Sequence, residues 1–504
     1  MSRARAIEVA IIGGGIGGIG AAVHLARRGT RTFTVFEKSE GPGGTWWDNR
    51  YPGAECDIPS ALYSYSFKPH DWTRTHASQE EIQQYVEETI DDYQLREHIR
   101  FGVGVRSAEW HERRQQYLVT LDNDETHWFD VVVSAVGMLN VPKVPDWPGI
   151  ETFEGPLFHS ARWDPKAELD GKRVAVVGAG ASATQVVPGL QPRVAELLSF
   201  QREPTWVLPK GDRDLTPEER KERRRFGWAR KTRFDMIRAM DKGHGSDPEM
   251  IEAQRKRLTA RINEAFDDRP DLAEAMTPTF QPRCKRNVFS DIYYPALKQD
   301  NVRLVPRGVE RITPRGVVDS TGEEHEVDAV VLTTGFRAAE FLTTVKVTGR
   351  GGTDLHDQWG LDPEAFLGIS VPNFPNFYML YGPNTHGTVV SFVLERQAEY
   401  VAKDVRRLRK RGGGTLEVRP EANAWFQRVL QEAISKVETW KSGCNNFYTS
   451  ASGKNVVQWP WTHQRYYAWT VLARRFASIH RPATAETRAA RTAIVPLPQQ
   501  EEAA

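Results

Sequence analysis

Two stretches of the chain show the same order of apolar and glycine-rich positions. Residues 7–12 (IEVAII) and 173–177 (RVAVV) are mostly apolar runs, typical of parallel strands buried on both faces. Each run passes into a glycine-rich turn and then into a segment with helical periodicity. A strand, a glycine turn and a helix in this order open a dinucleotide-binding unit. Two further apolar runs that end on glycine, residues 131–137 and 330–335, close the units, so the sequence predicts two nucleotide sites.

This pattern predicts an α/β fold with two dinucleotide-binding (Rossmann-like) domains. Residues 1–150 are expected to form the first part of one domain, and residues 151–171 a linker. Residues 172–344 form the second domain, with a charged helical insert at about 215–275. Residues 345–480 return to apolar strands and tight turns and are expected to rejoin the first domain, which makes it discontinuous. Residues 481–504 are rich in Ala, Pro, Gln and Glu and are expected to be disordered.

The composition limits the kinds of partner that this chain is expected to bind. The net charge is +1 over 504 residues, so no broad field favours nucleic acid or an anionic membrane. Apart from a glycine-rich N-terminal stretch that only superficially resembles a signal peptide, no long apolar run suggests a membrane segment. The three cysteines are far apart and indicate neither a disulfide framework nor a metal site. We expect a cytoplasmic protein, a monomer or small homo-oligomer, with a small-molecule substrate and no metal.

The first glycine turn has the spacing of a dinucleotide fingerprint. Its three glycines, at GxGxxG spacing, are Gly13, Gly15 and Gly18. They permit a tight turn, close approach of a pyrophosphate, and close packing of helix on strand. Glu37 ends the next strand, where a carboxylate accepts hydrogen bonds from ribose hydroxyls. A second glycine-rich turn follows that acid, as in units that bind FAD, and its candidate contacts are Gly44, Thr45 and Trp46.

The second nucleotide turn is a variant of the same motif. Its candidate contacts are Gly178, Gly180, Ser182 and Ala183, and alanine is accepted at the third motif position. The following strand leads to Arg202 rather than to an acid. An arginine here pairs with the 2′-phosphate of NADPH, which a carboxylate would repel. Two alternatives stay open: Arg202 is only a strand-end charge, or the neighbouring Glu203 weakens the preference for NADPH.

Two stretches resemble one enzyme family. Residues 43–67 (GGTWWDNRYPGAECDIPSALYSYSF) are similar to those of Baeyer–Villiger and related flavoprotein monooxygenases. The segment between the two units matches the family fingerprint FxGxxxHxxxW with a following Pro or Asp, through Phe153, Gly155, His159, Trp163 and Asp164. The chain is therefore identified as a member of the type I Baeyer–Villiger monooxygenases, within the flavin-containing monooxygenase superfamily. The resemblance implies a conformational role for His159 at the joint between two domains.

The resemblance also implies an active site. Arg286 corresponds to the active-site arginine of the family, Asp57 to the carboxylate that positions and helps it, and Lys285 to a phosphate-contacting lysine. Without the resemblance, Lys285 and Arg286 would be interpreted as a surface basic pair. Three further positions correspond to FAD contacts, although a core or turn role stays open for each: Tyr63, Val105 and Asn384. The chain departs from the family at Phe447, where relatives usually have a tryptophan.

The implied function is an FAD- and NADPH-dependent oxidoreductase. NADPH reduces FAD in the first domain, and O2 then gives a C4a-peroxyflavin, which inserts one oxygen atom next to a ketone carbonyl to form an ester or lactone. A permanently charged arginine suits that step because the attacking peroxide must stay an anion. The alternative is oxygenation of N or S atoms. A disulfide reductase would need a CxxC pair, which the sequence lacks, and a non-enzymatic sensor would leave Arg286 and Asp57 unexplained.

Overall fold

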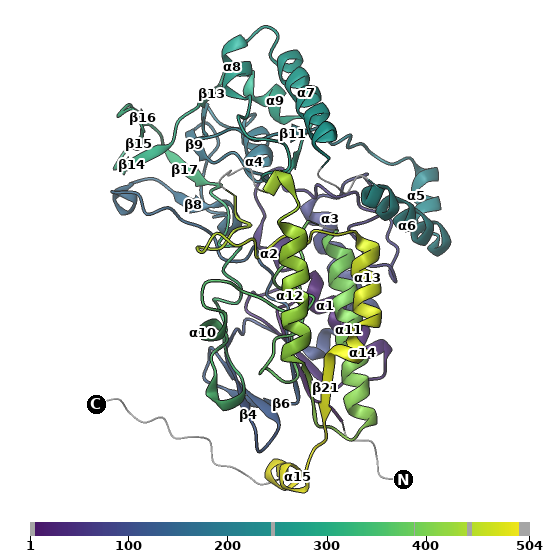
Figure 1. Ribbon diagram of the computed structural model, residues 1–504. Helices are drawn as coiled ribbons and strands as arrows, with labels where there is room; N and C mark the ends of the chain where they lie inside the picture. Colours follow the sequence, from purple (N-terminus) through teal and green to yellow (C-terminus); the bar gives the residue numbers. More distant parts are fainter. Residues whose placement is uncertain (1–5, 243–246, 388, 441–445, 493–504) are drawn as a thin grey trace, which may run out of the picture.

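Two parallel β-sheets of five strands each organise the chain. Figure 1 shows it as a computed structural model, which describes residues 6–242, 247–387, 389–440 and 446–492. The strand orders are β19-β7-β1-β2-β3 in the first sheet and β13-β10-β9-β17-β8 in the second. The second sheet lies in the upper part of Figure 1, and the long helices that cover the first sheet lie in the lower part.

The first sheet draws strands from both ends of the chain. Its strands are β1 (Val9–Ile12), β2 (Phe33–Glu37), β3 (Ile99–Phe101), β7 (Val131–Ser134) and β19 (Phe377–Met379). All four residues of β1 are buried, because β2 and β7 flank the strand and helices cover the sheet. Strand β19 follows the whole second unit in sequence yet pairs in parallel with β7, Phe377 opposite Val132. The predicted α/β fold with a discontinuous first domain is thereby confirmed.

Helices cover one side of the first sheet. They are α1 (Ile16–Arg27), α3 (Gln79–Asp92), α11 (Val390–Lys410), α12 (Pro420–Ile434) and α13 (His463–Leu472). Helix α3 begins where the Ser78 side chain accepts a hydrogen bond from the Glu81 backbone N–H, which satisfies an otherwise free donor of the first turn. A four-stranded sheet packs elsewhere on this unit, made of β4 (Val105–His111), β5 (Gln116–Leu121), β6 (Thr126–Phe129) and β18 (Lys346–Thr348). Together they enclose the first hydrophobic cores.

The second sheet includes part of the segment that we expected to be a linker. Its strands are β8 (Leu157–His159), β9 (Arg173–Val177), β10 (Glu196–Phe200), β13 (Val302–Val305) and β17 (Ala329–Leu332), with α4 (Ala183–Leu190) and α9 (Tyr293–Leu297) packed on it. A hairpin of β14 (Val309–Thr313), β15 (Gly316–Asp319) and β16 (Glu324–Glu326) follows β13. Strand β8 pairs with β17, Leu157 opposite Val330. Residues 151–171 thus contain an edge strand, which is too short for its periodicity to be read from the sequence.

The helical insert reaches both units. It comprises α5 (Pro217–Arg223), α6 (Phe226–Lys242), α7 (Pro248–Ala265) and α8 (Pro270–Ala275). Helices α7 and α8 bury Leu258 and Leu272 in the core of the second unit. Helix α6 instead docks on the first unit, where the buried Arg233 guanidinium donates to the carbonyl oxygens of Leu62 and Ser64, at 2.7 Å each. The insert therefore contacts both units and helps to hold them together.

The C-terminal segment corrects one expectation. Residues 481–504 were expected to be disordered, but α15 (Ala485–Thr492) is a helix, and β21 (Ser478–Arg481) pairs with β20 (Thr415–Val418). On α15, Arg491 donates to the Gln115 carbonyl oxygen at 2.7 Å and pairs with the buried Asp130 at 2.9 Å. The expectation is wrong for α15, whose polar sequence gave no sign of these tertiary contacts, and residues 493–504 lie outside the described residues.

Short elements complete the fold. They are α2 (Thr45–Asp48), β11 (Val207–Leu208), β12 (Val288–Phe289), α10 (Leu355–Trp359) and α14 (Arg474–Ala477). Strands β11 and β12 pair in parallel and bracket the helical insert in sequence. Within the described ranges, no helix combines the length and apolar character needed to cross a membrane.

Candidate active site

A cavity of about 1230 Å³ is lined by residues of both units. That volume exceeds the range of about 300–1,000 Å³ typical of pockets for one small ligand. Many of the residues singled out from the sequence line it: Gly13, Gly15, Glu37, Gly44, Thr45, Trp46, Asp57, Tyr63, Val105, Ser182, Lys285 and Arg286. The structure thus brings most of the first predicted nucleotide site, Ser182 and Lys285 of the second, and the predicted catalytic pair to one place.

The first glycine turn is shaped for a pyrophosphate. Gly13 has φ +108°, and a Cβ atom there would lie 2.7 Å from the Ala135 carbonyl oxygen. A Cβ on Gly18 would lie 1.9 Å from the Gly13 carbonyl oxygen, so Gly18 serves the packing of α1 on β1 rather than the cavity. At the end of β2, the Glu37 carboxylate accepts from the Gly14 N–H at 2.6 Å and from the Ser39 N–H at 2.8 Å. These residues fit a bound dinucleotide.

The second glycine-rich turn lies directly against the first. Gly43 forms a parallel bridge with Gly15, and Gly44 has φ +56°. In α2, the Trp46 indole N–H donates to the Tyr63 hydroxyl at 2.8 Å, and both side chains line the cavity. The predicted contact Asn384 does not line it. Its amide donates to the carbonyl oxygens of Asn455 and Gln458, at 3.0 and 3.1 Å, so this residue holds a turn in the structure.

The second nucleotide turn faces the same cavity from the other unit. Gly178 has φ +134°, and a Cβ there would lie 2.4 Å from the Thr333 carbonyl oxygen. Gly180 is exposed, with no atom within 4 Å of where its Cβ would be, so a nucleotide can approach its backbone. Ser182 lines the cavity, and the buried Ala183 begins α4. The residues present fit a second dinucleotide.

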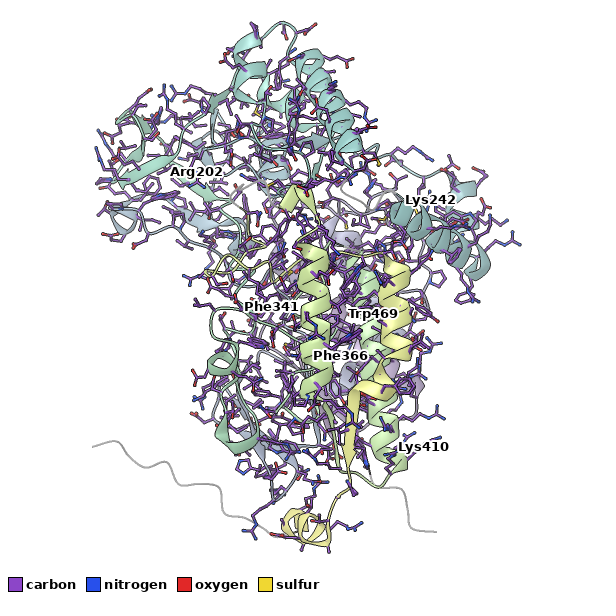
Figure 2. The ribbon with its side chains drawn as sticks, in the orientation of Figure 1. Arg202, Lys242, Phe341, Phe366, Lys410 and Trp469 are labelled. Atoms are coloured by element: carbon purple, nitrogen blue, oxygen red, sulfur yellow. The ribbon has the colours of Figure 1, made fainter. Side chains whose placement is uncertain are left out.

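Three charged side chains gather beyond the end of β10, where this fold reads the ribose 2′ position. Arg202 is exposed there, in the upper part of Figure 2. Glu203 accepts a short hydrogen bond from the Lys285 ammonium group, which also lies 4.5 Å from the centre of the Phe280 ring. The phosphate contacts of Arg202 and Lys285 stay predictions, and Glu203 already pairs with Lys285, one of the two cations.

Arg286 and Asp57 form the pair that joins the two units at the cavity. The guanidinium Nη2 donates to the Asp57 Oδ2 at 2.7 Å, between positions 229 residues apart. The neighbouring Asp57 carboxylate raises the pKa of Arg286, so the guanidinium stays charged. Arg286 keeps 37% of its side-chain surface open, and it lines the cavity. Two residues earlier, Cys284 is engaged in a disulfide bond. This bond was not predicted from the sequence, because the three cysteines are far apart in the chain.

The last third of the chain supplies cavity residues that the sequence analysis missed. Tyr381, His386, Tyr448 and Gln458 line the cavity. The Tyr381 hydroxyl and the His386 Nδ1 are 2.7 Å apart. Burial, with a contribution from the Arg286 charge, lowers the pKa of His386 to about 3, and burial raises the pKa of both tyrosines. The signal available in the sequence was a histidine two residues after a Gly-Pro-Asn turn.

The fingerprint residues lie away from the cavity. His159 ends β8, where its Nδ1 accepts from the Ala161 N–H at 3.1 Å and its Nε2–H donates to the Gly335 carbonyl oxygen at 3.0 Å. Trp163 packs against Phe158 and lines a second cavity of about 650 Å³. The other three serve local packing and turns: Phe153, Gly155 and Asp164. None of the five fingerprint residues lines the large cavity, so the fingerprint lies outside the candidate reaction centre, and its conformational role stays a prediction.

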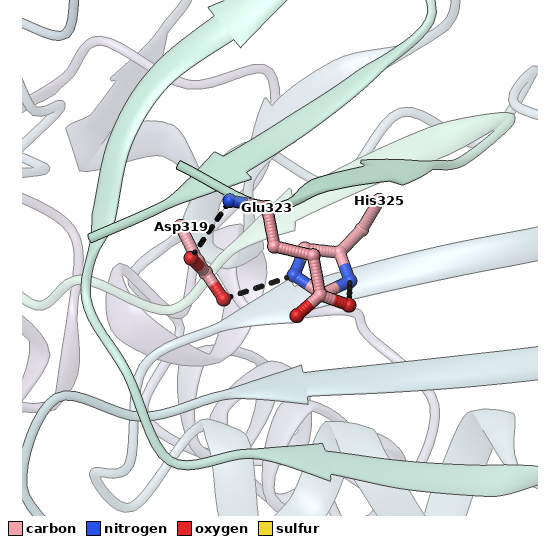
Figure 3. A group of neighbouring side chains, drawn as sticks. All are labelled: Asp319, Glu323 and His325. Atoms are coloured by element: carbon pink, nitrogen blue, oxygen red, sulfur yellow. Dashed lines mark hydrogen bonds and ion pairs between the residues drawn. The ribbon is translucent and has the colours of Figure 1, made fainter. Parts of the chain in front are cut away.

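A group of possible metal ligands lies on the β15–β16 hairpin (Figure 3). Asp319, Glu323 and His325 point toward one another there. The Asp319 carboxylate already accepts from Arg307 at 2.9 Å and from the His325 Nε2–H at 3.1 Å, and the other His325 nitrogen accepts from Arg303 at 2.6 Å. Because both imidazole nitrogens are engaged and two arginines border the group, these side chains do not fit a metal ion.

Comparison with known proteins identifies a matching family and similar enzymes. The family described as flavin-binding monooxygenase-like matches residues 6–346. A Baeyer–Villiger monooxygenase of Streptomyces coelicolor is 40% identical over 90% of this chain and 89% of its own length. Another, from Pseudomonas aeruginosa, is 37% identical over 93% and 90%.

Solved structures agree in fold. A cyclohexanone monooxygenase from Rhodococcus sp. Phi1 bound to NADP+ has a TM-score of 0.86 at 29% identity, covering 95% of this chain and 99% of its own. A steroid monooxygenase bound to NADP has a TM-score of 0.85 at 27% identity, with the same coverage. A cyclohexanone monooxygenase with bound cyclohexanone has a TM-score of 0.83 at 28% identity, covering 95% and 99%.

Proposed function

Since this chain belongs to the flavin-binding monooxygenase-like family and is a Baeyer–Villiger monooxygenase, we propose that oxygen transfer takes place at its Arg286–Asp57 pair. The observation that carries the proposal is the position of this pair, 2.7 Å apart, in the cavity that both glycine turns face. The pair brings a fixed positive charge to the one place that two dinucleotides and a small substrate can share.

The two turns assign the two cofactors. The first turn would hold FAD, through Glu37 and the backbone of Gly13, Gly15 and Gly44. The second turn would hold NADPH, through Gly180 and Arg202. When bound, NADPH supplies hydride to FAD, and FAD supplies the activation of O2.

Arg286 stabilises the negative charge that develops on the ketone oxygen when its carbonyl carbon is attacked. A lysine can lose its proton in a cavity shielded from water, whereas a guanidinium beside a carboxylate does not. Asp57 orients the guanidinium through the 2.7 Å hydrogen bond, and among the described residues the guanidinium makes no other hydrogen bond, so its other N–H groups are available to a ligand in the cavity. Preorganised donors of this kind are worth roughly 10²- to 10³-fold in rate.

The substrate is a small-molecule ketone, and O2 is the second substrate. Apolar side chains line parts of the cavity and offer such a ketone a dry surface: Ile58, Val390, Leu394, Trp440 and Trp461. Cyclohexanone, which a solved relative holds, sets the lower size limit for the ketones to try. The net charge of +1 creates no broad field that would favour a nucleic-acid or membrane partner.

The test is product identity. The purified protein loaded with FAD is given NADPH, ¹⁸O2 and a panel of cyclic, aryl, linear and steroid ketones, together with thioanisole and a tertiary amine. One labelled oxygen atom in an ester or lactone is the expected result, measured by mass spectrometry. Labelled sulfoxide or N-oxide with no ester from any ketone would instead assign heteroatom oxygenation to the site.

A further inference from the structure

The turn after β19 places two hydrogen-bonding side chains in the cavity beside Arg286. Tyr381 has φ +61°, a conformation held by a 2.6 Å hydrogen bond from its backbone N–H to the Gln397 side chain. Five residues later, the His386 backbone is clamped on both sides, donating to the Val457 carbonyl oxygen at 3.0 Å and accepting from the Trp459 N–H at 2.8 Å. Both side chains are therefore fixed in place where they line the cavity.

The contact between Tyr381 and His386 selects one tautomer of the imidazole. The hydroxyl oxygen and Nδ1 are 2.7 Å apart. A phenol donates a hydrogen bond more readily than it accepts one, and burial raises the pKa of Tyr381, so its proton stays in place. His386 is neutral because burial and then Arg286 lower its pKa to about 3. With Nδ1 accepting from the tyrosine, the single imidazole hydrogen is on Nε2.

The Nε2–H group of His386 is a donor that the protein itself leaves open. Among the described residues, no hydrogen bond is made to Nε2. A donor enclosed in a cavity without a partner is destabilising, so such a group is suited to a ligand acceptor. Arg286 lines the same cavity, and its charge contributes to the lowered pKa of His386, so both donors are available to a ligand there.

We propose that His386 is a second catalytic donor, whose Nε2–H binds the ketone oxygen alongside Arg286, and that Tyr381 is the positioning residue that fixes its tautomer. The inference rests on the proposed function and adds to it how the site recognises a carbonyl. A ketone oxygen has two lone pairs and no hydrogen to donate, so it accepts from both groups at once. A site with two donors rejects an analogue whose carbonyl is replaced by a methylene group, because both donors then lose their acceptor.

A purely structural role for His386 gives a different expectation. Its ring also packs against Phe447 and Tyr448, with ring centres 5.9 Å away in each case. A packing role would be fulfilled by phenylalanine and would affect a ketone and its methylene analogue alike. A donor role would be fulfilled by glutamine, whose amide N–H reaches about as far as Nε2.

The test uses the FAD-loaded enzyme and two matched probe pairs, cyclohexanone with methylenecyclohexane and acetophenone with α-methylstyrene. The variants are His386→Phe, His386→Gln and Tyr381→Phe, each checked for FAD content and Tm. Dissociation constants come from the absorbance change of the oxidised enzyme, and kcat and KM from ester formation with whichever ketone of the panel described above the wild type converts.

The proposal predicts that His386→Phe loses about tenfold in affinity for the ketone and in kcat/KM, with methylene-analogue affinity unchanged, and that His386→Gln recovers most of the loss. Tyr381→Phe is expected to fall between them while keeping its FAD. Equal losses for ketone and analogue, or no loss in either histidine variant, would overturn the proposal while leaving the ester-forming function intact. Failure of the wild type to convert any ketone would overturn the proposed function itself, which separates the two failures.

Discussion

At the residue scale, the charged group beyond β10 shows how one side chain sets cofactor preference. Arg202 and Lys285 are suited to a 2′-phosphate, but Glu203 accepts a short hydrogen bond from Lys285. A phosphate entering here has to compete with that carboxylate for the lysine and also meets its negative charge. We therefore predict a smaller margin in affinity of NADPH over NADH than two unopposed cations would give.

Replacing Glu203 by Gln should increase that margin. Because the change removes a charge and frees Lys285, we expect Glu203→Gln to bind NADP+ about fivefold more tightly, with NAD+ binding unchanged. Isothermal titration at low and high salt measures both affinities. Glu310→Gln, an exposed acid on β14, is the matched control. An unaltered ratio of NADP+ to NAD+ affinity would show that Glu203 does not act on the 2′ position.

The site residues differ in how far the sequence could predict them. Gly13, Gly15 and Glu37 follow from local spacing, because a turn and the strands on either side of it impose that spacing. Arg286 and Asp57 were predicted through the family resemblance and not from the residues alone, and the structure pairs them. Tyr381 and His386 were missed, since only the folded chain brings their turn to the cavity.

At the element scale, strand β8 explains why the fingerprint segment lies away from the chemistry. His159 joins the end of β8 to Gly335, in the loop after β17, through its Nε2, while its Nδ1 accepts from the Ala161 N–H. The Nδ1 atom must stay unprotonated to accept from the Ala161 N–H. Burial lowers the pKa of His159 to about 4, well below its usual 6.5. These two hydrogen bonds of His159 therefore require the neutral form of its imidazole.

This predicts an acid-sensitive joint. A histidine whose folded pKa lies below its unfolded pKa stabilises the fold fully above pH 6.5, and that stabilisation is lost as the pH falls toward 4. We therefore expect the Tm difference between the wild type and His159→Gln to be largest near pH 7.5 and to shrink by pH 4.5. The other buried histidines are present in both proteins, so their contributions to the pH dependence cancel in this Tm difference. A difference that stays constant with pH would contradict this interpretation.

The elements themselves were predictable where a periodic pattern is long enough. The apolar runs at 7–12 and 173–177 became β1 and β9, each in the middle of a parallel sheet. The three residues of β8 were taken as linker, because so short a strand shows no alternation. Helix α15 was taken as disordered, because what orders it is Arg491 docking on residues near position 115, and not its own composition.

At the scale of the whole molecule, the two units are joined by polar contacts beside the cavity. Gln185 of α4 accepts from the Tyr51 hydroxyl at 2.9 Å and donates to the Glu55 carbonyl oxygen at 2.9 Å. Nearby, the Lys210 ammonium group meets the Glu55 carboxylate at 2.6 Å. The sequence predicted two units and their order but not these contacts, because residues 130 positions apart follow no spacing rule.

Removing the Gln185 amide should loosen this interface. Gln185→Ala removes the acceptor of the Tyr51 hydroxyl and the donor to the Glu55 carbonyl, at a cost of about 1–3 kcal/mol. We expect a Tm lower by a few degrees in differential scanning calorimetry, with the FAD content retained. Gln84→Ala, an exposed residue of α3, serves as the control and should leave the Tm unchanged. Identical melting of Gln185→Ala and the wild type would mean that the amide does not hold the units together.

The central claim, that oxygen transfer depends on the Arg286–Asp57 pair, is tested most directly by separating the two half-reactions in Arg286→Ala. Anaerobic stopped-flow mixing with NADPH should give FAD reduction within about threefold of the wild type. With O2 and a converted ketone, ester formation should fall by roughly 10²-fold or more, with NADPH consumption diverted to hydrogen peroxide. Ester formation close to that of the wild type would contradict the account and remove Arg286 from the reaction.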